Sequence, residues 1–148
     1  MLPDMRRFVS DHGLENVVVF HGRKPNEEMP AYYRLADACL VSLKADNQTG
    51  LSLPIKVQGY MAAGKPILGM IDGSAAEAVR EAQCGACVPA GDVDGLANLM
   101  QDFIGHREKY AACGENARDY FKRNFTKAIF MQKLEMEMER LGKETCQR

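Results

Sequence analysis

A polar loop that runs into a short helix is the part of the sequence with the clearest potential for chemistry. Residues 44–50 are mostly small or polar, and Ser52 and Pro54 follow at positions typical of a helix start. Free N–H groups and the positive end of the helix dipole meet at such a start and favour an anion. The pattern therefore predicts a phosphate-binding site. Lys56, expected in the first turn, could place a charge near the phosphate or could be an ordinary solvated lysine.

The helix after this loop has clear signals for its end and for the strand that follows. Gly64 can adopt the left-handed conformation of a helix cap, and Pro66 cannot continue a helix. The mainly apolar residues 67–71 come next and favour a strand. We therefore expect a helix over residues 54–63 that leads directly into a buried strand.

Helical and strand patterns alternate along the whole chain, which predicts an α/β sandwich with a parallel sheet. Gly13 should end the first helix, Asn26 should cap the second, and Asp92 should cap a later one. The expected helices are residues 5–12, 26–35, 54–63, 74–82, 93–103, 110–121 and 130–141, and the expected strands are residues 17–20, 38–43, 67–71 and 87–88. Ligands of such sheets bind beyond the carboxyl ends of the strands.

Composition limits the classes of partner. The chain has 148 residues, near the modal size of one domain, and its formal net charge is −1. The basic residues are spread out, which argues against nucleic acid and anionic membranes as partners and favours a small ligand or a protein. No apolar run approaches the about 20 residues of a membrane span, and no signal peptide is visible at Met1, so we expect a cytoplasmic protein.

Two of the five cysteines, Cys84 and Cys87, have the spacing of a redox motif. A redox pair should open a helix after a strand, whereas here Gly85 resembles a helix cap and Cys87 lies at the start of an expected strand. A zinc site would need further ligands, and the three histidines are scattered singly. Reduced thiols with no metal are therefore the expectation, and Cys39 should fill the core.

Several motifs follow one another in a fixed order along nearly the whole chain. The central one is Pro54-Ile55-Lys56, followed by Ala62-Ala63-Gly64-Lys65-Pro66. The others are residues 17–22, 29–37, 73–79 and 84–92 and the helix from Val93. The set resembles the donor-binding domain of retaining glycosyltransferases of family 4. These enzymes have the GT-B fold and transfer a sugar from a nucleotide diphosphate sugar.

The resemblance implies a fold and a domain organisation. Residues 1–148 would form a single donor domain, a Rossmann-like three-layer sandwich that is the C-terminal half of a GT-B fold. The domain would lack its first strand, and an N-terminal acceptor domain would precede it in the full enzyme. The last helix of such enzymes braces the acceptor domain, so its apolar face is expected here without a partner.

The resemblance also implies which residues bind the donor, although it assigns no catalytic residue, metal or cofactor. The loop after Phe20 should lie near the nucleobase, and residues 47–53 should lie near the phosphates. For His21 and Lys24, ordinary surface roles are alternatives. The expected donor-binding residues are His21, Gly22, Arg23, Lys24, Asn47, Thr49, Gly50, Leu51, Ser52, Leu53, Lys56 and Gly59.

Two departures from the family pattern bear on activity. Family members commonly carry two glutamates with seven residues between them, the second of which holds the ribose of the donor, and Leu51 and Gly59 occupy these positions here. The glycine also costs about 0.5–1 kcal/mol relative to alanine inside a helix. In addition, the glycine-rich turn and basic pair that grip the diphosphate in the family lie before the start of this chain.

The leading hypothesis is therefore the donor-binding part of a glycosyltransferase of cell-surface polysaccharide biosynthesis, inactive as an isolated chain. Its partners would be a nucleotide diphosphate sugar and either an acceptor domain or a second copy of the chain. The alternatives are a non-catalytic remnant that binds a protein and a nucleotide-binding regulatory module. The full-length enzyme could also associate with the inner face of the membrane.

Overall fold

The computed structural model describes residues 2–43 and 53–145, without the side chains of residues 143–145. The chain divides into two compact units, Met1–Pro30 and Ala31–Arg148, which are described separately. The first unit contains helix α1 (Leu2–Asp11) and the 3-10 turn η1 (Asn26–Glu28). Helix α2 (Met29–Leu35) follows at the boundary.

The first helix forms and ends as expected. Val9 is buried, and the Leu14 N–H donates to the Val9 carbonyl at 2.9 Å. Gly13 adopts a φ of +63°, which permits the left-handed turn after the helix. The predicted side-chain cap at Asn26 is wrong, because Asn26 itself lies within η1, and Pro25 precedes it in extended conformation.

The expected strand at residues 17–20 does not form. The N–H groups of Val17 and Val18 both donate to the Leu14 carbonyl at 2.9 Å, so a local turn uses the groups that a strand would offer to a neighbour. Val17 and Val19 are exposed. The apolar run was therefore a misleading signal, because hydrophobicity alone does not supply a pairing partner.

The second unit is a helix–sheet–helix sandwich. Strands β1 (Cys39–Ser42), β2 (Ile67–Met70) and β3 (Gly85–Val88) pair in parallel in the order β1-β2-β3, with Cys39 opposite Ile67 and Ile67 opposite Gly85. Helices α3 (Ile55–Ala63) and α4 (Gly73–Glu81) cross between successive strands. The predicted α/β class with a parallel sheet is confirmed.

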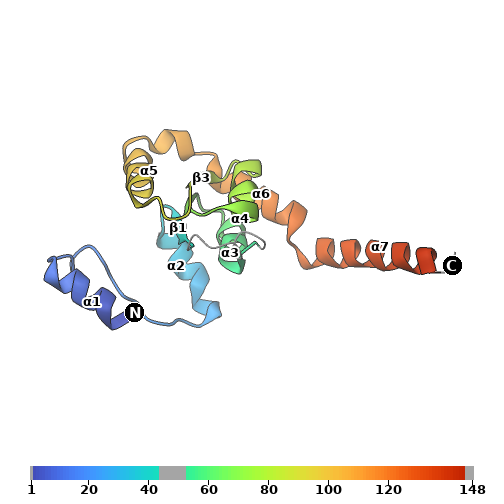
Figure 1. The fold of residues 1–148 in the computed structure, drawn as a ribbon, viewed down its shortest axis with the longest axis horizontal. Coiled ribbons are helices and arrows are strands. Elements are labelled where there is room, and N and C mark those ends of the chain that lie inside the picture. Colours follow the sequence, from blue (N-terminus) through green and yellow to red (C-terminus); the bar gives the residue numbers. More distant parts are fainter. Residues whose placement is uncertain (1, 44–52, 146–148) are drawn as a thin grey trace. The chain divides into compact units, whose positions relative to one another are not determined.

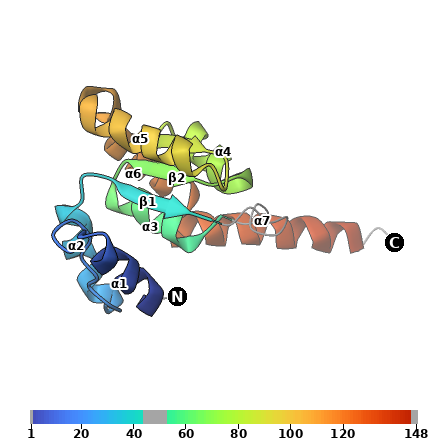
Figure 2. The same ribbon diagram turned by 60° about the vertical axis from the view of Figure 1, so that its left-hand side comes forward.

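The remaining helices complete the layers. They are α5 (Val93–Gly105), η3 (Arg107–Tyr110), α6 (Cys113–Asn124) and α7 (Lys127–Thr145). Helix α5 covers β2 and β3 on one face, while α3, α4 and α6 lie on the other (Figures 1 and 2). Asp92 caps α5 as predicted, because its carboxylate accepts the Gly95 N–H at 2.8 Å.

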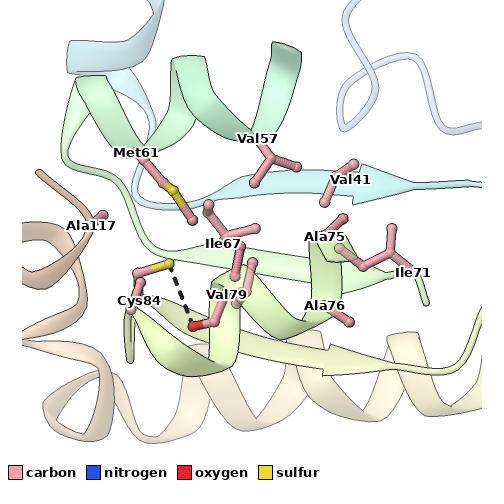
Figure 3. Close-up of a cluster of buried hydrophobic side chains, with 12 residues drawn as sticks. Val41, Val57, Met61, Ile67, Ile71, Ala75, Ala76, Val79, Cys84 and Ala117 are labelled. Carbon is pink, nitrogen blue, oxygen red and sulfur yellow. Dashed lines mark hydrogen bonds between the residues drawn. The ribbon is translucent and has the colours of Figure 1, made fainter. Parts of the chain in front are cut away.

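The core lies between the sheet and the layer that contains α3, α4 and α6 (Figure 3). Val57 and Met61 of α3 pack with Ile67 of β2, and all three are fully buried. Burial of side chains of this size contributes about 1.5–3 kcal/mol each. The edge strand β1 alternates between buried and exposed residues, with Leu40 exposed.

Two glycines allow backbone segments to approach closely. Gly64 ends α3 as predicted, with φ and ψ of +68° and +44°, and a Cβ there would meet the Gly114 carbonyl of α6 at 3.1 Å. Gly85 was expected to cap α4, but it belongs to β3 instead. It has a φ of +159°, and a Cβ there would overlap the Ile67 backbone. Gln83, with a φ of +47°, makes the left-handed turn after α4.

We predict that Gly64→Ala destabilises the chain by about 1–2 kcal/mol or more, because alanine resists the left-handed conformation and its methyl group would press on α6. Gly142→Ala is the control, since Gly142 lies in α7 with open space around it. This control should be neutral or slightly stabilising. Urea unfolding followed by circular dichroism measures both, and equal stabilities would contradict the role of Gly64.

Candidate functional site

The carboxyl ends of the three strands mark the side of the sheet where a ligand is expected. The strands end at Ser42, Met70 and Val88, and α4 begins three residues after β2, at Gly73. Helix α3 also begins after a carboxyl end, that of β1, across the connection at residues 43–54. Two helix N-termini therefore follow the carboxyl ends of neighbouring strands, which is the arrangement that binds phosphate groups in many α/β proteins.

The start of α3 has the features expected of an anion site. The first helical hydrogen bonds are donated by Val57 and Gln58 to the Pro54 carbonyl, at 3.0 and 3.4 Å. The N–H groups of Ile55 and Lys56 therefore have no acceptor within the helix. Lys56 is exposed in this first turn, as predicted, and Leu53 packs against the core just before it. The other expected phosphate-binding residues, Asn47, Thr49, Gly50, Leu51 and Ser52, lie outside the described residues.

Gly59 lies one turn further along α3 and faces α2. A Cβ at this position would lie 3.6 Å from the Tyr33 hydroxyl, an ordinary contact distance. The Tyr33 ring in turn meets the Tyr60 ring edge to face, with centroids 5.8 Å apart. Sequence reasoning named Gly59 but gave no role to Tyr33.

The four expected nucleobase residues belong to the first unit. Gly22 has a φ of +72°, His21 and Arg23 are exposed, and Lys24 lies 3.8 Å from the Glu28 carboxylate. Leu53, Lys56 and Gly59 belong to the second unit. Whether the two groups share one site therefore stays a prediction.

A polar hollow of about 220 Å³ lies at the carboxyl ends of β2 and β3. Glu77 and Arg80 of α4 line it, and the Asp72 carboxylate beside it accepts the Ala90 N–H at 3.2 Å. None of the expected donor-binding residues lines this hollow. Gly73 at the start of α4 and Glu77 in its second turn were the available signals in the sequence.

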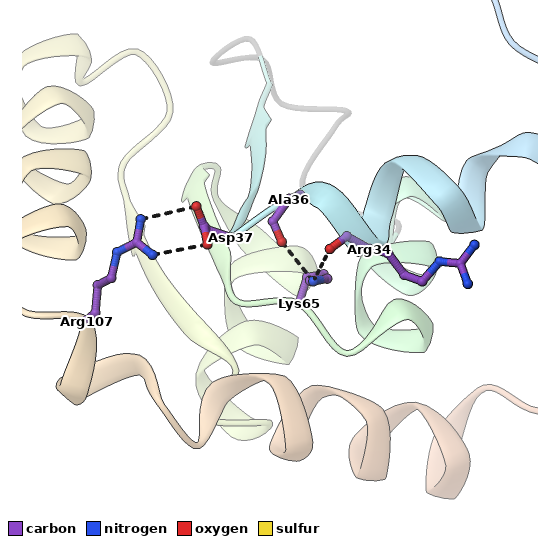
Figure 4. A network of polar contacts seen from close by, with 5 residues as sticks. All are labelled: Arg34, Ala36, Asp37, Lys65 and Arg107. Carbon is purple, nitrogen blue, oxygen red and sulfur yellow. Dashed lines mark hydrogen bonds and ion pairs between the residues drawn. The ribbon is translucent and has the colours of Figure 1, made fainter.

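A second polar cluster fixes the connection between α2 and β1 (Figure 4). The Lys65 ammonium donates to the Ala36 carbonyl at 2.8 Å and to the Arg34 carbonyl at 3.4 Å. The Arg107 guanidinium grips the Asp37 carboxylate with two bonds of 3.1 and 3.2 Å. This exposed ion pair contributes little to stability, but the Lys65 bonds hold the end of α2 beside the end of α3.

Cys84 and Cys87 lie in the sheet region and not at a helix start. Cys84 is buried just before β3, and its thiol lies 3.7 Å from the Val79 carbonyl, while Cys87 lies within β3. Burial raises the pKa of Cys84 to about 12 and the pKa of Cys87 to about 11. Cys39 is buried in β1, as expected of a core residue. Within residues 2–43 and 53–145 no group of His, Cys, Asp and Glu side chains could hold a metal ion.

Comparison with known proteins identifies the class and then the family. The fold is that of GT-B glycosyltransferases, as its similarity to two solved structures indicates. Sucrose-phosphate synthase from Thermosynechococcus elongatus aligns with a TM-score of 0.78 and 23% identity, over 93% of this chain and 34% of the other. Anabaena Alr3699/HepE in complex with UDP aligns with a TM-score of 0.81 and 22% identity, over 93% and 36%.

Residues 4–120 match the family model for glycosyl transferases group 1, and the chain belongs to this family. One relative is the GDP-mannose-dependent alpha-(1-6)-phosphatidylinositol monomannoside mannosyltransferase of Mycolicibacterium smegmatis, which is 28% identical over 80% of this chain and 32% of the relative. Another is the putative colanic acid biosynthesis glycosyltransferase WcaL of Escherichia coli, 25% identical over 88% and 32%. The chain thus spans about a third of the length of these relatives. None of the helices in the described ranges could cross a membrane.

We predict that the thiols of Cys84 and Cys87 react slowly in the folded chain. With pKa values of about 12 and 11, less than about 0.1% of either thiol is ionised at pH 8. Alkylation with iodoacetamide at pH 8, followed by peptide mass spectrometry, should label both far faster in 6 M guanidinium chloride. Rapid labelling of the folded chain, a disulfide between the two, or stoichiometric zinc in elemental analysis would contradict this assignment.

Proposed function

We propose that the chain is the donor-binding part of a retaining glycosyltransferase that transfers a sugar from a nucleotide diphosphate sugar to an acceptor. One observation carries this proposal. In a member of the glycosyl transferases group 1 family, the helix α3 that follows β1 starts with N–H groups that have no acceptor within the helix. The neighbouring lysine, Lys56, is exposed and forms no ion pair with another described residue.

The proposed chemistry follows from where charge develops. When the bond between sugar and diphosphate breaks, negative charge builds on the departing diphosphate. Backbone N–H groups at the start of α3 would stabilise this charge because they are already oriented toward it, and Lys56 would add a point charge. Residues 47–53 would contact the phosphates and residues 21–24 the nucleobase. The nucleotide sugar is a substrate, and the proposal involves no metal or cofactor.

The proposed context comes from the relatives. One relative is named for GDP-mannose and another for colanic acid biosynthesis, and one structural neighbour was solved with UDP-glucose. These names support a role in polysaccharide assembly, which we propose takes place at the cell surface from the cytoplasmic side. Residues 1–148 would act as a single donor domain that works with an acceptor domain or with a second copy of the chain.

A non-catalytic, protein-binding role is the second candidate, and two observations favour it. Gly59 stands where the family resemblance implies a ribose-binding glutamate, and α7 exposes a row of large apolar side chains. Phe130 and Met138 of this row are 62% and 65% exposed. An apolar helix face of this kind suits association with another protein.

We predict that the chain binds nucleoside diphosphates weakly and transfers no sugar by itself. The start of α3 would supply a phosphate contact, but no acceptor-binding region is expected within the chain. Isothermal titration with UDP and GDP measures the first part, and a radiolabelled UDP-glucose or GDP-mannose assay measures the second. Turnover by the isolated chain would refute the prediction of inactivity.

We further predict that Lys56→Ala weakens diphosphate binding on the order of tenfold, because a charge-assisted contact to phosphate is lost. Isothermal titration with the tighter of UDP and GDP measures the change. Folding stability should change little, since Lys56 is exposed.

Lys122→Ala is the matched control, since Lys122 is an exposed lysine of α6 that pairs only weakly with Asp119 at 3.8 Å. This variant should bind like the unmodified chain. If Lys56→Ala and Lys122→Ala bind equally well, Lys56 is an ordinary surface lysine and the phosphate site lies elsewhere.

A further inference from the structure

The Tyr33 hydroxyl of α2 lies beside the backbone of Gly59 in α3, where there is no side chain. Helix α3 exposes backbone at Gly59, where most residues would project a side chain toward α2. A Cβ built there would lie 3.6 Å from the Tyr33 hydroxyl oxygen. The phenol therefore reaches the space beside position 59 and brings a hydrogen-bonding group to it.

The surrounding contacts hold Tyr33 in this orientation. Its ring meets the Tyr60 ring edge to face at 5.8 Å, and the Tyr60 hydroxyl donates to the Leu40 carbonyl of β1 at 3.4 Å. Lys65 bonds to the Arg34 and Ala36 carbonyls and thereby fixes the end of α2 (Figure 4). Tyr33 is thus anchored through its ring and its backbone, which leaves its hydroxyl to serve another partner.

No described residue forms a hydrogen bond with this hydroxyl. In the described chain, no fully buried side-chain oxygen or nitrogen lacks a partner, so the unpaired Tyr33 hydroxyl is open to solvent. Partial burial of the ring raises the pKa of Tyr33, which keeps the phenol protonated at neutral pH. The group can therefore both donate and accept a hydrogen bond.

We infer that the Tyr33 hydroxyl, beside Gly59, is a contact for a sugar hydroxyl of the bound nucleotide. This inference rests on the proposed function. Gly59 lies four residues after Ile55, about 6 Å along the helix from its N-terminus. In a nucleotide sugar, the diphosphate joins the ribose on one side to the transferred hexose on the other. With the diphosphate at the N-terminus of α3, either ring could place its hydroxyls beside Tyr33 and Gly59.

Calorimetric titrations of Tyr33→Phe test the inference and distinguish the two rings. The probes are UDP and GDP, the 2′,3′-dideoxy form of whichever binds more tightly, and UDP-glucose or GDP-mannose. If Tyr33 contacts the ribose, Tyr33→Phe should weaken the ribonucleotide about three- to tenfold and leave the dideoxy form unchanged. If it contacts the hexose, only the nucleotide sugar should weaken.

Tyr110→Phe is the control, since its hydroxyl lies 3.0 Å from the Asp102 carboxylate, a partner on α5. This variant should bind every probe like the unmodified chain. If Tyr33→Phe also binds every probe unchanged, or weakens all of them equally, the inference is wrong while the proposed function stands. If the unmodified chain binds none of the nucleotides, both are overturned.

A second variant tests whether positions 33 and 59 face the same group of the ligand. A Cβ at position 59 makes only an ordinary contact with Tyr33, and Gly59→Glu adds a carboxylate that can accept bonds from two sugar hydroxyls. In the Tyr33→Phe background, it should restore binding of the hydroxyl-bearing probe to at least the original affinity. A double variant as weak as Tyr33→Phe would show that positions 33 and 59 do not face the same ligand group.

Discussion

The left-handed turn at Gly64 is the constraint on which the arrangement of the second unit depends. It stops α3, and its N–H donates back to the Met61 carbonyl at 3.0 Å. The absence of a side chain lets Gly114 of α6 approach, and the chain then enters β2 within three residues. The same turn places Lys65 against the carbonyls at the end of α2. One backbone conformation therefore fixes α3 relative to β2, α6 and α2 together.

This turn was also the feature that the sequence predicted best, because its causes are local. The left-handed preference of Gly64, the restriction at Pro66 and the capping carboxylate of Asp92 each act within a few residues, and the structure has all three as expected. Strand formation at residues 17–20 depends on a distant partner instead. The N–H groups of Val17 and Val18 instead donate to the Leu14 carbonyl, and hydrophobic periodicity does not predict such a local turn.

The candidate site, like the fold, was predictable from the sequence only where its features depend on local signals. The start of α3 and the exposed Lys56 followed from local helix signals. Tyr33 was missed because the contact that matters is with Gly59 of α3, which lies 26 residues further along the chain. In the sequence alone, Gly59 indicates only that a glutamate is missing. Gly85 was misassigned for a similar reason, since the contact that requires glycine there is with the neighbouring strand at Ile67.

The inferred replacement of a carboxylate contact by a phenol contact near α3 would have an energetic consequence. A hydrogen bond to a charged group contributes about 1.5–3 kcal/mol, whereas a neutral one contributes about 0.5–1.5 kcal/mol. If Tyr33 replaces the glutamate that the family resemblance places at position 59, the sugar hydroxyls are held less tightly. A larger share of the binding energy would then come from the phosphate contacts at the start of α3. Such a site would depend more on the backbone N–H groups and Lys56, which in the proposed reaction would act where charge develops as the diphosphate departs. Weak ground-state binding would therefore be compatible with the catalytic role that we propose.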